Sequence, residues 1–399
     1  MASKGLPLSR DDILRSFFHQ VFIAVCATFL PEKQANRNNR DRKRKMKRKI
    51  TTWPLFLVMT VFVTVLSPAR QGYACTRAVY LGPEGTIITG RSMDWEENTG
   101  TDLWTFPAGM KRDGAAGPTS IKWVSKYGSV VCSFYNVSTV DGMNEKGLVA
   151  NVLYLDESEY GKPDGKRPTI SIAAWAQYVL DNYATVAETV KALREGPFVV
   201  IAPTLPNGSP ANGHLAISDP TGDSAIFEYI GGKLIIHHAR NYQVMTNSPV
   251  FDKQLALNEY WREIGGETFL PGTSRASDRF ARASFYINAI PKTTDMLQAV
   301  ASVFGVIRGV SVPLGITTPG QPNIASTYWR TFSDHKNKVY YFDSATSPTV
   351  FWVPLGELDL KEGAPVKKLT LVGGKTYSGS AASKFEPAQP FVFLQGTVK

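Results

Sequence analysis

Cysteine and histidine are scarce in this chain of 399 residues, which contains three cysteines and five histidines. A disulfide-stapled fold is excluded, because Cys75 and Cys132 alone do not make a disulfide framework for a large domain. The histidines show no Cys/His or metal-ligand spacing. His237 and His238 are neighbours on one expected strand, so their side chains would face opposite ways. The sequence therefore predicts no metal site.

Excess charge is missing from most of the chain. The formal net charge is +10, and 14 of the 44 Lys and Arg residues precede Cys75, as do 4 of the 34 Asp and Glu residues, so the remainder is neutral overall. The basic run RDRKRKMKRK at 40–49 is compatible with a nucleic-acid patch. The apolar run that follows it instead favours the start of an export signal, whose cleavage would remove this charge.

Residues 46–74 have the three parts of a signal peptide. Basic residues after Met46 lead into TTWPLFLVMTVFVTVL, which is short for a membrane span, and then into the polar SPARQGYA. Gly72 and Ala74 occupy the −3 and −1 positions that signal peptidase prefers. Cleavage there would make Cys75 the first residue of a periplasmic or secreted protein with no stable membrane anchor.

Residues 1–45 are interpreted as an atypical N-terminal extension or a mis-assigned start. Their apolar patch at 17–30 leaves open a second membrane-active segment.

Residues 75–399 are predicted to form one α+β domain without internal repeats. Strand-like runs alternate in blocks with helical ones instead of forming regular βαβ units, which favours antiparallel sheets with helices outside. The pattern predicts a hairpin through Pro83-Glu84-Gly85, two strands within 128–155 around a turn at 144–147, and strands from 214 and from 326 onward. Helices are expected at 169–196, as two segments ending at Gly196, and at 278–306, broken at Pro291.

Cys75 poses the main chemical question. A lipoprotein cysteine, on a lipid-anchored binding protein, would need a Leu-containing box, but QGYAC has Tyr73 and no Leu. As an N-terminal residue, Cys75 would combine a thiol with an α-amine of pKa about 8 that can act as its base. In GRSMDW, Arg91 and Asp94 lie on the returning strand of the hairpin. Arg91 would supply the cation that stabilises the thiolate, and Asp94 the carboxylate that holds the amine. The alternative is that the two form an ordinary surface ion pair.

Five segments in order give this chain a family resemblance: CTRAVYLGPEGTIITGRSMDW, DGMNEKGLVANVLYL, VMTNSPVFDKQL, SRASDRFARASF and TYWRTFSDHKNKVYYFDS. Together they resemble the choloylglycine hydrolase family, which comprises bile salt hydrolases and penicillin V acylases among the N-terminal nucleophile hydrolases. The resemblance implies a four-layer αββα sandwich with two antiparallel sheets between helical layers. It also implies hydrolysis of a linear amide through a thioester, no metal or organic cofactor, and a homotetramer.

The resemblance assigns roles residue by residue. Cys75 matches the nucleophile, Arg91 the thiol-activating arginine and Asp94 the carboxylate that holds the amine. Asn247, in MTNSP, matches the side-chain donor to the oxyanion, although a turn residue before Pro249 is the alternative. Tyr154, in NVLYL, supplies a second donor through its N–H, which is compatible with a place in the core.

Arg279, in DRFAR, matches a supporting arginine. The family more often has Ser where this chain has Asp278, and an ion pair of Arg279 with Asp295 is the alternative.

Met93, Phe134, Tyr135 and Met143 are the candidates for binding the acyl group, with the strand core as the alternative. Tyr154 stands where bile salt hydrolases often have Asn. Together with the export signal, this favours a penicillin V acylase, with N-acyl homoserine lactones as a further substrate class and conjugated bile salts as the alternative. Cys132 is expected to be a buried free thiol on a strand.

Overall fold

The computed structural model describes residues 75–265, 268–316 and 325–396. The predicted extension, signal peptide and cleavage site lie outside these residues. Within the described ranges, no helix has the length and apolar character needed to cross a membrane.

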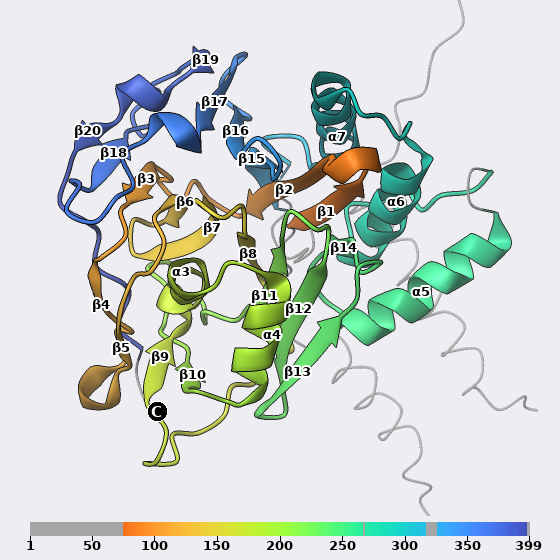
Figure 1. Ribbon diagram of the computed structural model, residues 1–399. Coiled ribbons are helices and arrows are strands. Elements are labelled where there is room, and N and C mark those ends of the chain that lie inside the picture. The colour runs from red at the N-terminus through yellow and green to blue at the C-terminus, as the bar shows by residue number, and fades with distance from the viewer. Residues whose placement is uncertain (1–74, 266–267, 317–324, 397–399) are drawn as a thin grey trace, which may run out of the picture. The chain divides into compact units, whose positions relative to one another are not determined.

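One sheet contains seven strands and carries the N-terminal hairpin (Figure 1). All its pairings are antiparallel except the last, between β17 and β19. In spatial order the strands are β14 (Val244–Met245), β1 (Thr76–Leu81), β2 (Ile87–Trp95), β15 (Ser326–Asp334), β16 (Val339–Ser344), β17 (Val350–Pro354) and β19 (Gly379–Ser380).

The second sheet contains nine strands, all paired antiparallel. Its order is β13 (Lys233–His238), β12 (Ser224–Ile230), β11 (His214–Ser218), β8 (Val149–Leu153), β7 (Ser138–Asn144), β6 (Ser129–Phe134), β3 (Leu103–Phe106), β18 (Lys367–Leu369) and β20 (Glu386–Pro387). Two smaller pairs are β4 (Lys111–Asp113) with β5 (Lys122–Val124), and β9 (Thr169–Ser171) with β10 (Val199–Ile201).

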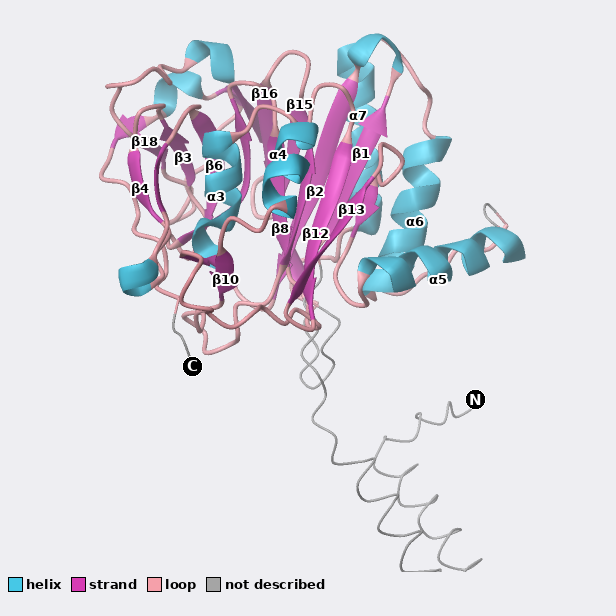
Figure 2. Cartoon of the chain, turned by 60° about the horizontal axis from the view of Figure 1, so that its bottom comes forward, coloured by secondary structure: helices cyan, strands magenta, loops and turns pink. Residues whose placement is uncertain are grey.

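Helices cover the outer face of each sheet (Figures 1 and 2). The nine-stranded sheet carries α3 (Ile172–Asn182) and α4 (Val186–Arg194), and the seven-stranded sheet carries α6 (Ala276–Ala289) and α7 (Met296–Val310). Gly90 on β2 permits the close approach of α7, since a Cβ there would lie 2.7 Å from the Ile307 side chain. The predicted four-layer α+β sandwich is confirmed.

Two apolar cores follow from this layering. Met93 and Trp329 of the seven-stranded sheet share one buried cluster with Val130 and Met143 of the other sheet. A second cluster, which includes Trp175 of α3, fills the space between the nine-stranded sheet and its helices.

The hairpin and both helical segments were predicted correctly. A short 3-10 turn at Pro83–Gly85 joins β1 to β2, and the segment 169–196 forms α3 and α4, which ends before Gly196, although its first three residues form β9. The predicted break at Pro291 separates α6 from α7, where Asp295 caps α7 by accepting from the N–H groups of Leu297 and Gln298.

The prediction of two strands within 128–155 is wrong, because this segment forms three. A tight turn separates β6 from β7, and Tyr135 and Asn136 adopt φ values of 53° and 52° there. Asn136 is typical of such a turn, but Tyr135 is not, and no glycine accompanies them. Helix α5 (Phe251–Ile264), which contacts α6, and strands β18 to β20 were not predicted.

Candidate active site

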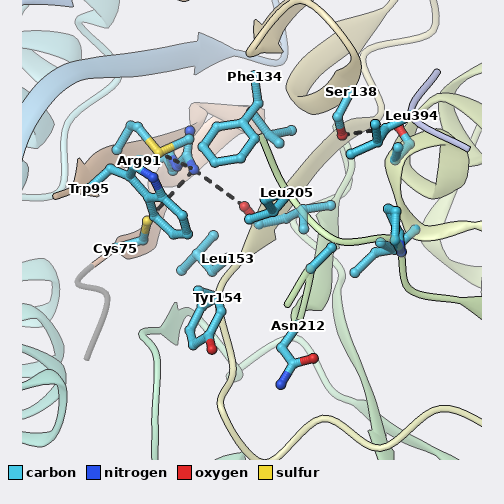
Figure 3. A pocket seen from close by; sticks show the side chains of 17 residues that line it. Cys75, Arg91, Trp95, Phe134, Ser138, Leu153, Tyr154, Leu205, Asn212 and Leu394 are labelled. Atoms are coloured by element: carbon cyan, nitrogen blue, oxygen red, sulfur yellow. Dashed lines mark hydrogen bonds between the residues drawn. The ribbon is translucent and has the colours of Figure 1, made fainter. Parts of the chain in front are cut away.

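The β1–β2 hairpin places Arg91 and Asp94 beside Cys75. Thr76 pairs with Ser92, so Cys75 lies level with the segment between the two charged residues. The Arg91 Nη2 atom is 3.8 Å from Cys75 Sγ, and the thiol lies 3.7 Å from the Asp94 carbonyl oxygen. All three residues are at most 2% exposed. A short sequence separation thus produces a buried Cys–Arg–Asp group, of which Cys75 and Arg91 are seen in Figure 3.

Arg91 is held between the two sheets. Its Nη2 donates to the Val152 carbonyl on β8 at 3.3 Å, and its guanidinium lies 4.4 Å from the Trp329 ring centroid. The Nη1 atom is 3.9 Å from Asp141 Oδ2. Asp141 accepts hydrogen bonds from Asn151, Thr331 and Tyr340. These contacts fix the orientation of the guanidinium beside the thiol.

Asp94 is a fully buried carboxyl group. It accepts hydrogen bonds from Thr327 and, at 3.3 Å, from Ser92, and lies 3.7 Å from Arg279 Nη1. Burial raises the pKa of Asp94 to about 6, against the opposing influence of the Arg279 charge and the Thr327 hydroxyl. A β-bulge at Tyr328 interrupts the β2–β15 register next to the Thr327–Asp94 pair.

Arg279, in the first turn of α6, ties the site to the helical layer. It donates to the Cys75 carbonyl at 2.6 Å, to the Thr76 hydroxyl, and to Asn247 Oδ1 at 3.0 Å. The alternative ion pair with Asp295 does not form, because Asp295 caps α7.

Asn247 follows β14 and joins three parts of the site. The Cys75 nitrogen donates to its Oδ1, and its Nδ2 donates to the Tyr154 carbonyl at 2.7 Å. This nitrogen is a peptide N–H in the structure, so the contact of a free Cys75 α-amine with Asp94 stays a prediction. Tyr154 follows β8, is 7% exposed, and packs edge-on against Trp95 with ring centroids 5.9 Å apart. All six residues predicted for catalysis therefore lie together.

The thiol does not have a depressed pKa in this structure. Burial raises the pKa of Cys75, and the Arg91 charge opposes that shift without overcoming it. Arg91 thus acts in the predicted direction, but the apolar surroundings dominate.

A mainly apolar pocket opens beside Cys75 and Arg91, with about 550 Å³ of free space including its mouth. Of the residues predicted to bind the acyl group, Met93 and Phe134 line it. The other lining residues were not predicted, apart from Tyr154: Trp95, Ser138, Val140, Val152, Leu153, Ile172, Ala173, Pro203, Leu205, Ala211, Asn212 and Leu394 (Figure 3).

Tyr135 and Met143 do not line the pocket. Met143 is fully buried in the core between the sheets. Tyr135 packs against Phe134, with ring centroids 4.7 Å apart, while its hydroxyl donates to Glu97 and accepts from Trp95 Nε1. Tyr135 therefore supports two lining residues from behind.

The remaining thiol and the histidines stand apart from this site. Cys75 and Cys132 are both free, and Cys132 is buried on β6, 3.2 Å from the Tyr340 hydroxyl, as predicted. His237 faces buried Glu228 at 3.4 Å, whereas His238 faces Asp223 at 2.8 Å on the other side of β13. Across the described ranges, no group of three or more His, Cys, Asp or Glu has an arrangement suited to a metal ion.

Comparisons with known proteins agree with this geometry. Residues 75–368 match the family described as linear amide C–N hydrolases, choloylglycine hydrolase family. A penicillin V acylase of Pectobacterium atrosepticum is 51% identical over 345 residues, which cover 80% of this chain and 92% of the relative.

Solved structures give the same result. The structure of a penicillin V acylase from Agrobacterium tumefaciens is 59% identical, with a TM-score of 0.76, and the match covers 80% of this chain and 99% of that one. A mutant conjugated bile acid hydrolase from Clostridium perfringens, 22% identical, has a TM-score of 0.65 over 77% of this chain and 98% of its own, a likeness of fold alone. This chain belongs to the choloylglycine hydrolase family and is a linear amide C–N hydrolase similar to penicillin V acylases.

Proposed function

We propose that this enzyme is a penicillin V acylase that uses Cys75 as an N-terminal nucleophile. The observation that carries the proposal is the apolar pocket that opens directly on the Cys75 thiol, with Trp95, Phe134 and Tyr154 in its wall. Such a wall suits the phenoxyacetyl group of penicillin V, since aromatic rings pack favourably edge to face. The polar β-lactam nucleus then points away from the pocket.

The proposed reaction begins with cleavage after Ala74, which gives Cys75 a free α-amine. The amine takes the proton of the thiol as Sγ attacks the amide carbon, and a C–S bond forms. The C–N bond then breaks as the amine passes the proton to the leaving nitrogen. Water hydrolyses the resulting thioester, releases the acid, and regenerates the thiol.

Developing negative charge on the carbonyl oxygen needs nearby donors. The Asn247 amide lies beside the Cys75 nitrogen, and its Nδ2 has a second N–H besides the one on the Tyr154 carbonyl. The family resemblance adds the Tyr154 N–H. Each donor of this kind contributes roughly 3–4 kcal/mol to the transition state in comparable enzymes.

Export is part of this proposal. Residues 46–74 act as the signal peptide, and the mature enzyme works in the periplasm or outside the cell. The homotetramer remains a prediction from the family resemblance.

A substrate panel tests the proposal. With the processed enzyme, penicillin V is expected to have the highest kcat/KM, followed by N-acyl homoserine lactones and then glycocholate, because the rigid steroid has no aromatic group to match the pocket wall. Product analysis should give phenoxyacetate and 6-aminopenicillanic acid in equal amounts, and Cys75→Ala is the control for background hydrolysis. A higher kcat/KM for glycocholate would reject this assignment in favour of a bile salt hydrolase.

The pH dependence gives a second test, through Asp94. Protonation of the amine base, whose pKa is about 8, gives a first fall in kcat/KM, and loss of the ionised carboxylate that holds the amine adds a second, steeper fall as the pH drops through the Asp94 pKa. Thr327 donates to Asp94 and lowers that pKa, so Thr327→Val is expected to move this second limb upward by about 0.7 pH units, the equivalent of one hydrogen bond of about 1 kcal/mol. Thr327→Ser keeps the hydroxyl and should leave the limb in place. An unchanged limb in both variants would remove Asp94 from this role.

A further inference from the structure

The pocket beside Cys75 has two distinct ends (Figure 3). Cys75, Arg91 and Trp95 lie at one end, and Ser138 and Leu394 lie at the other. The lining between them is aliphatic and aromatic. A group that enters from the thiol therefore extends toward Leu394.

Leu394 comes from a part of the chain beyond the family match, which ends at residue 368. It belongs to the segment 388–396, which contacts β3, the β6–β7 turn and the start of α3 without forming a helix or strand of its own. Among the described residues that line the pocket, Leu394 alone follows Asn212 in sequence.

Hydrogen bonds and aromatic contacts fix this segment. The Leu394 N–H donates to the Val137 carbonyl at 2.8 Å, and its carbonyl accepts from the Ser171 hydroxyl at 2.7 Å. Gly396 N–H donates to the Ala115 carbonyl at 2.8 Å, so the segment is held on both sides of Leu394. Phe391 packs edge-on against Trp104, with ring centroids 5.4 Å apart. Because the backbone on both sides of Leu394 is held in this way, its side chain has a fixed position in the pocket wall.

We propose that Leu394 is the end wall of the acyl pocket and limits the length of the acyl group that this enzyme accepts. The inference rests on the proposed function, in which the acyl group occupies the pocket. Ile172 and Ala173 lie at the buried start of α3, where a change of size would disturb the helix, since Ser171 caps it. Leu394 is half-buried, so a smaller or larger residue at this position would change the length of the pocket without repacking the sandwich.

A chain-length series tests the inference. The substrates are 6-aminopenicillanic acid acylated with straight chains from butanoyl to dodecanoyl, and the readout is kcat/KM against chain length. Leu394→Ala removes three carbons and should move the optimum to longer chains, with a gain of roughly fourfold for each extra methylene that the new space buries. Leu394→Phe should move the optimum to shorter chains. The kcat/KM for the butanoyl substrate should change less than that for the long chains in either variant.

The control is Val392→Ala on the same segment, because Val392 is 81% exposed and does not line the pocket. Opposite shifts in the two Leu394 variants, with no shift in the control, support the inference, since loss of stability cannot produce shifts of opposite sign. A uniform change across all chain lengths would overturn it while leaving penicillin V hydrolysis by the unmodified enzyme intact. Failure of the unmodified enzyme on every acyl amide would overturn the proposed function and this inference together.

Discussion

A chain that begins at Cys75 is expected to hydrolyse penicillin V about a thousand times faster, in kcat/KM, than the same chain with Ala74 retained. Retaining Ala74 turns the α-amine into a peptide nitrogen, which has no basic lone pair and cannot accept the thiol proton. A positioned general base contributes typically 10²- to 10⁴-fold. A loss of about a thousandfold lies above the lower end of this range, since burial raises the thiol pKa and leaves little thiolate without a base.

Two measurements make this comparison secure. Intact mass must establish where each protein begins, and unfolding in urea must show that both are equally stable. The Cys75 nitrogen already donates to Asn247 as a peptide N–H, so Ala74 is expected to leave the fold unchanged. Cys75→Ser, made in the chain that begins at residue 75, keeps the amine but replaces the nucleophile. Equal activity of the chains with and without Ala74 would show that the amine is not the base.

The sequence predicted the hairpin part of the site because that part depends on short-range geometry. Arg91 and Asp94 follow Cys75 by 16 and 19 residues, and one tight turn at Pro83–Gly85 brings them back beside it. Strand alternation places their side chains on opposite faces of β2, Arg91 toward the other sheet and Asp94 toward Arg279 of α6. The family resemblance added Asn247 and Arg279, whose positions depend on contacts across more than 170 residues of chain.

The pocket wall was predicted less well because two local irregularities shift the strand pattern. The turn at Tyr135 and Asn136 divides what reads as one strand, and a bulge at Val140 offsets β7 against β6. Met143, which was predicted to bind the acyl group, lies in the core, whereas the bulged Val140 lines the pocket. Leu394 carried no signal at all, since its place depends on a segment that docks from the far end of the chain.

The supporting contacts of the site also had no sequence signal. Thr327 meets Asp94 across 233 residues, and Asp141 meets Arg91 from the opposite sheet. Threonine and aspartate are common on strands and at turns, so neither residue type marks a contact of this kind. Only the packing of the two sheets brings these groups to the thiol.

Replacing Arg279 with methionine is expected to destabilise the protein by about 3–5 kcal/mol at pH 8. The buried Asp94 carboxylate would then lose the positive charge of Arg279 beside it, and the Cys75 carbonyl and Asn247 Oδ1 would each lose a hydrogen-bond donor. The cost should shrink at pH 5. Burial raises the pKa of Asp94 to about 6, so a carboxyl group without its cation becomes neutral below that pH and no longer needs one.

Urea unfolding at pH 5 and pH 8 measures this effect, with Arg282→Met as the control. Arg282 lies on the same helix and donates to the Pro271 and Thr273 carbonyls but makes no contact with Cys75 or Asp94 in the structure described here, so its replacement should cost less and show little pH dependence. Adding Asp94→Asn to Arg279→Met should recover part of the lost stability at pH 8, because the uncompensated charge is gone. If the cost of Arg279→Met is the same at both pH values and Asp94→Asn restores nothing, then Arg279 stabilises the site through its hydrogen bonds to the Cys75 strand and Asn247, and its charge is not what Asp94 requires.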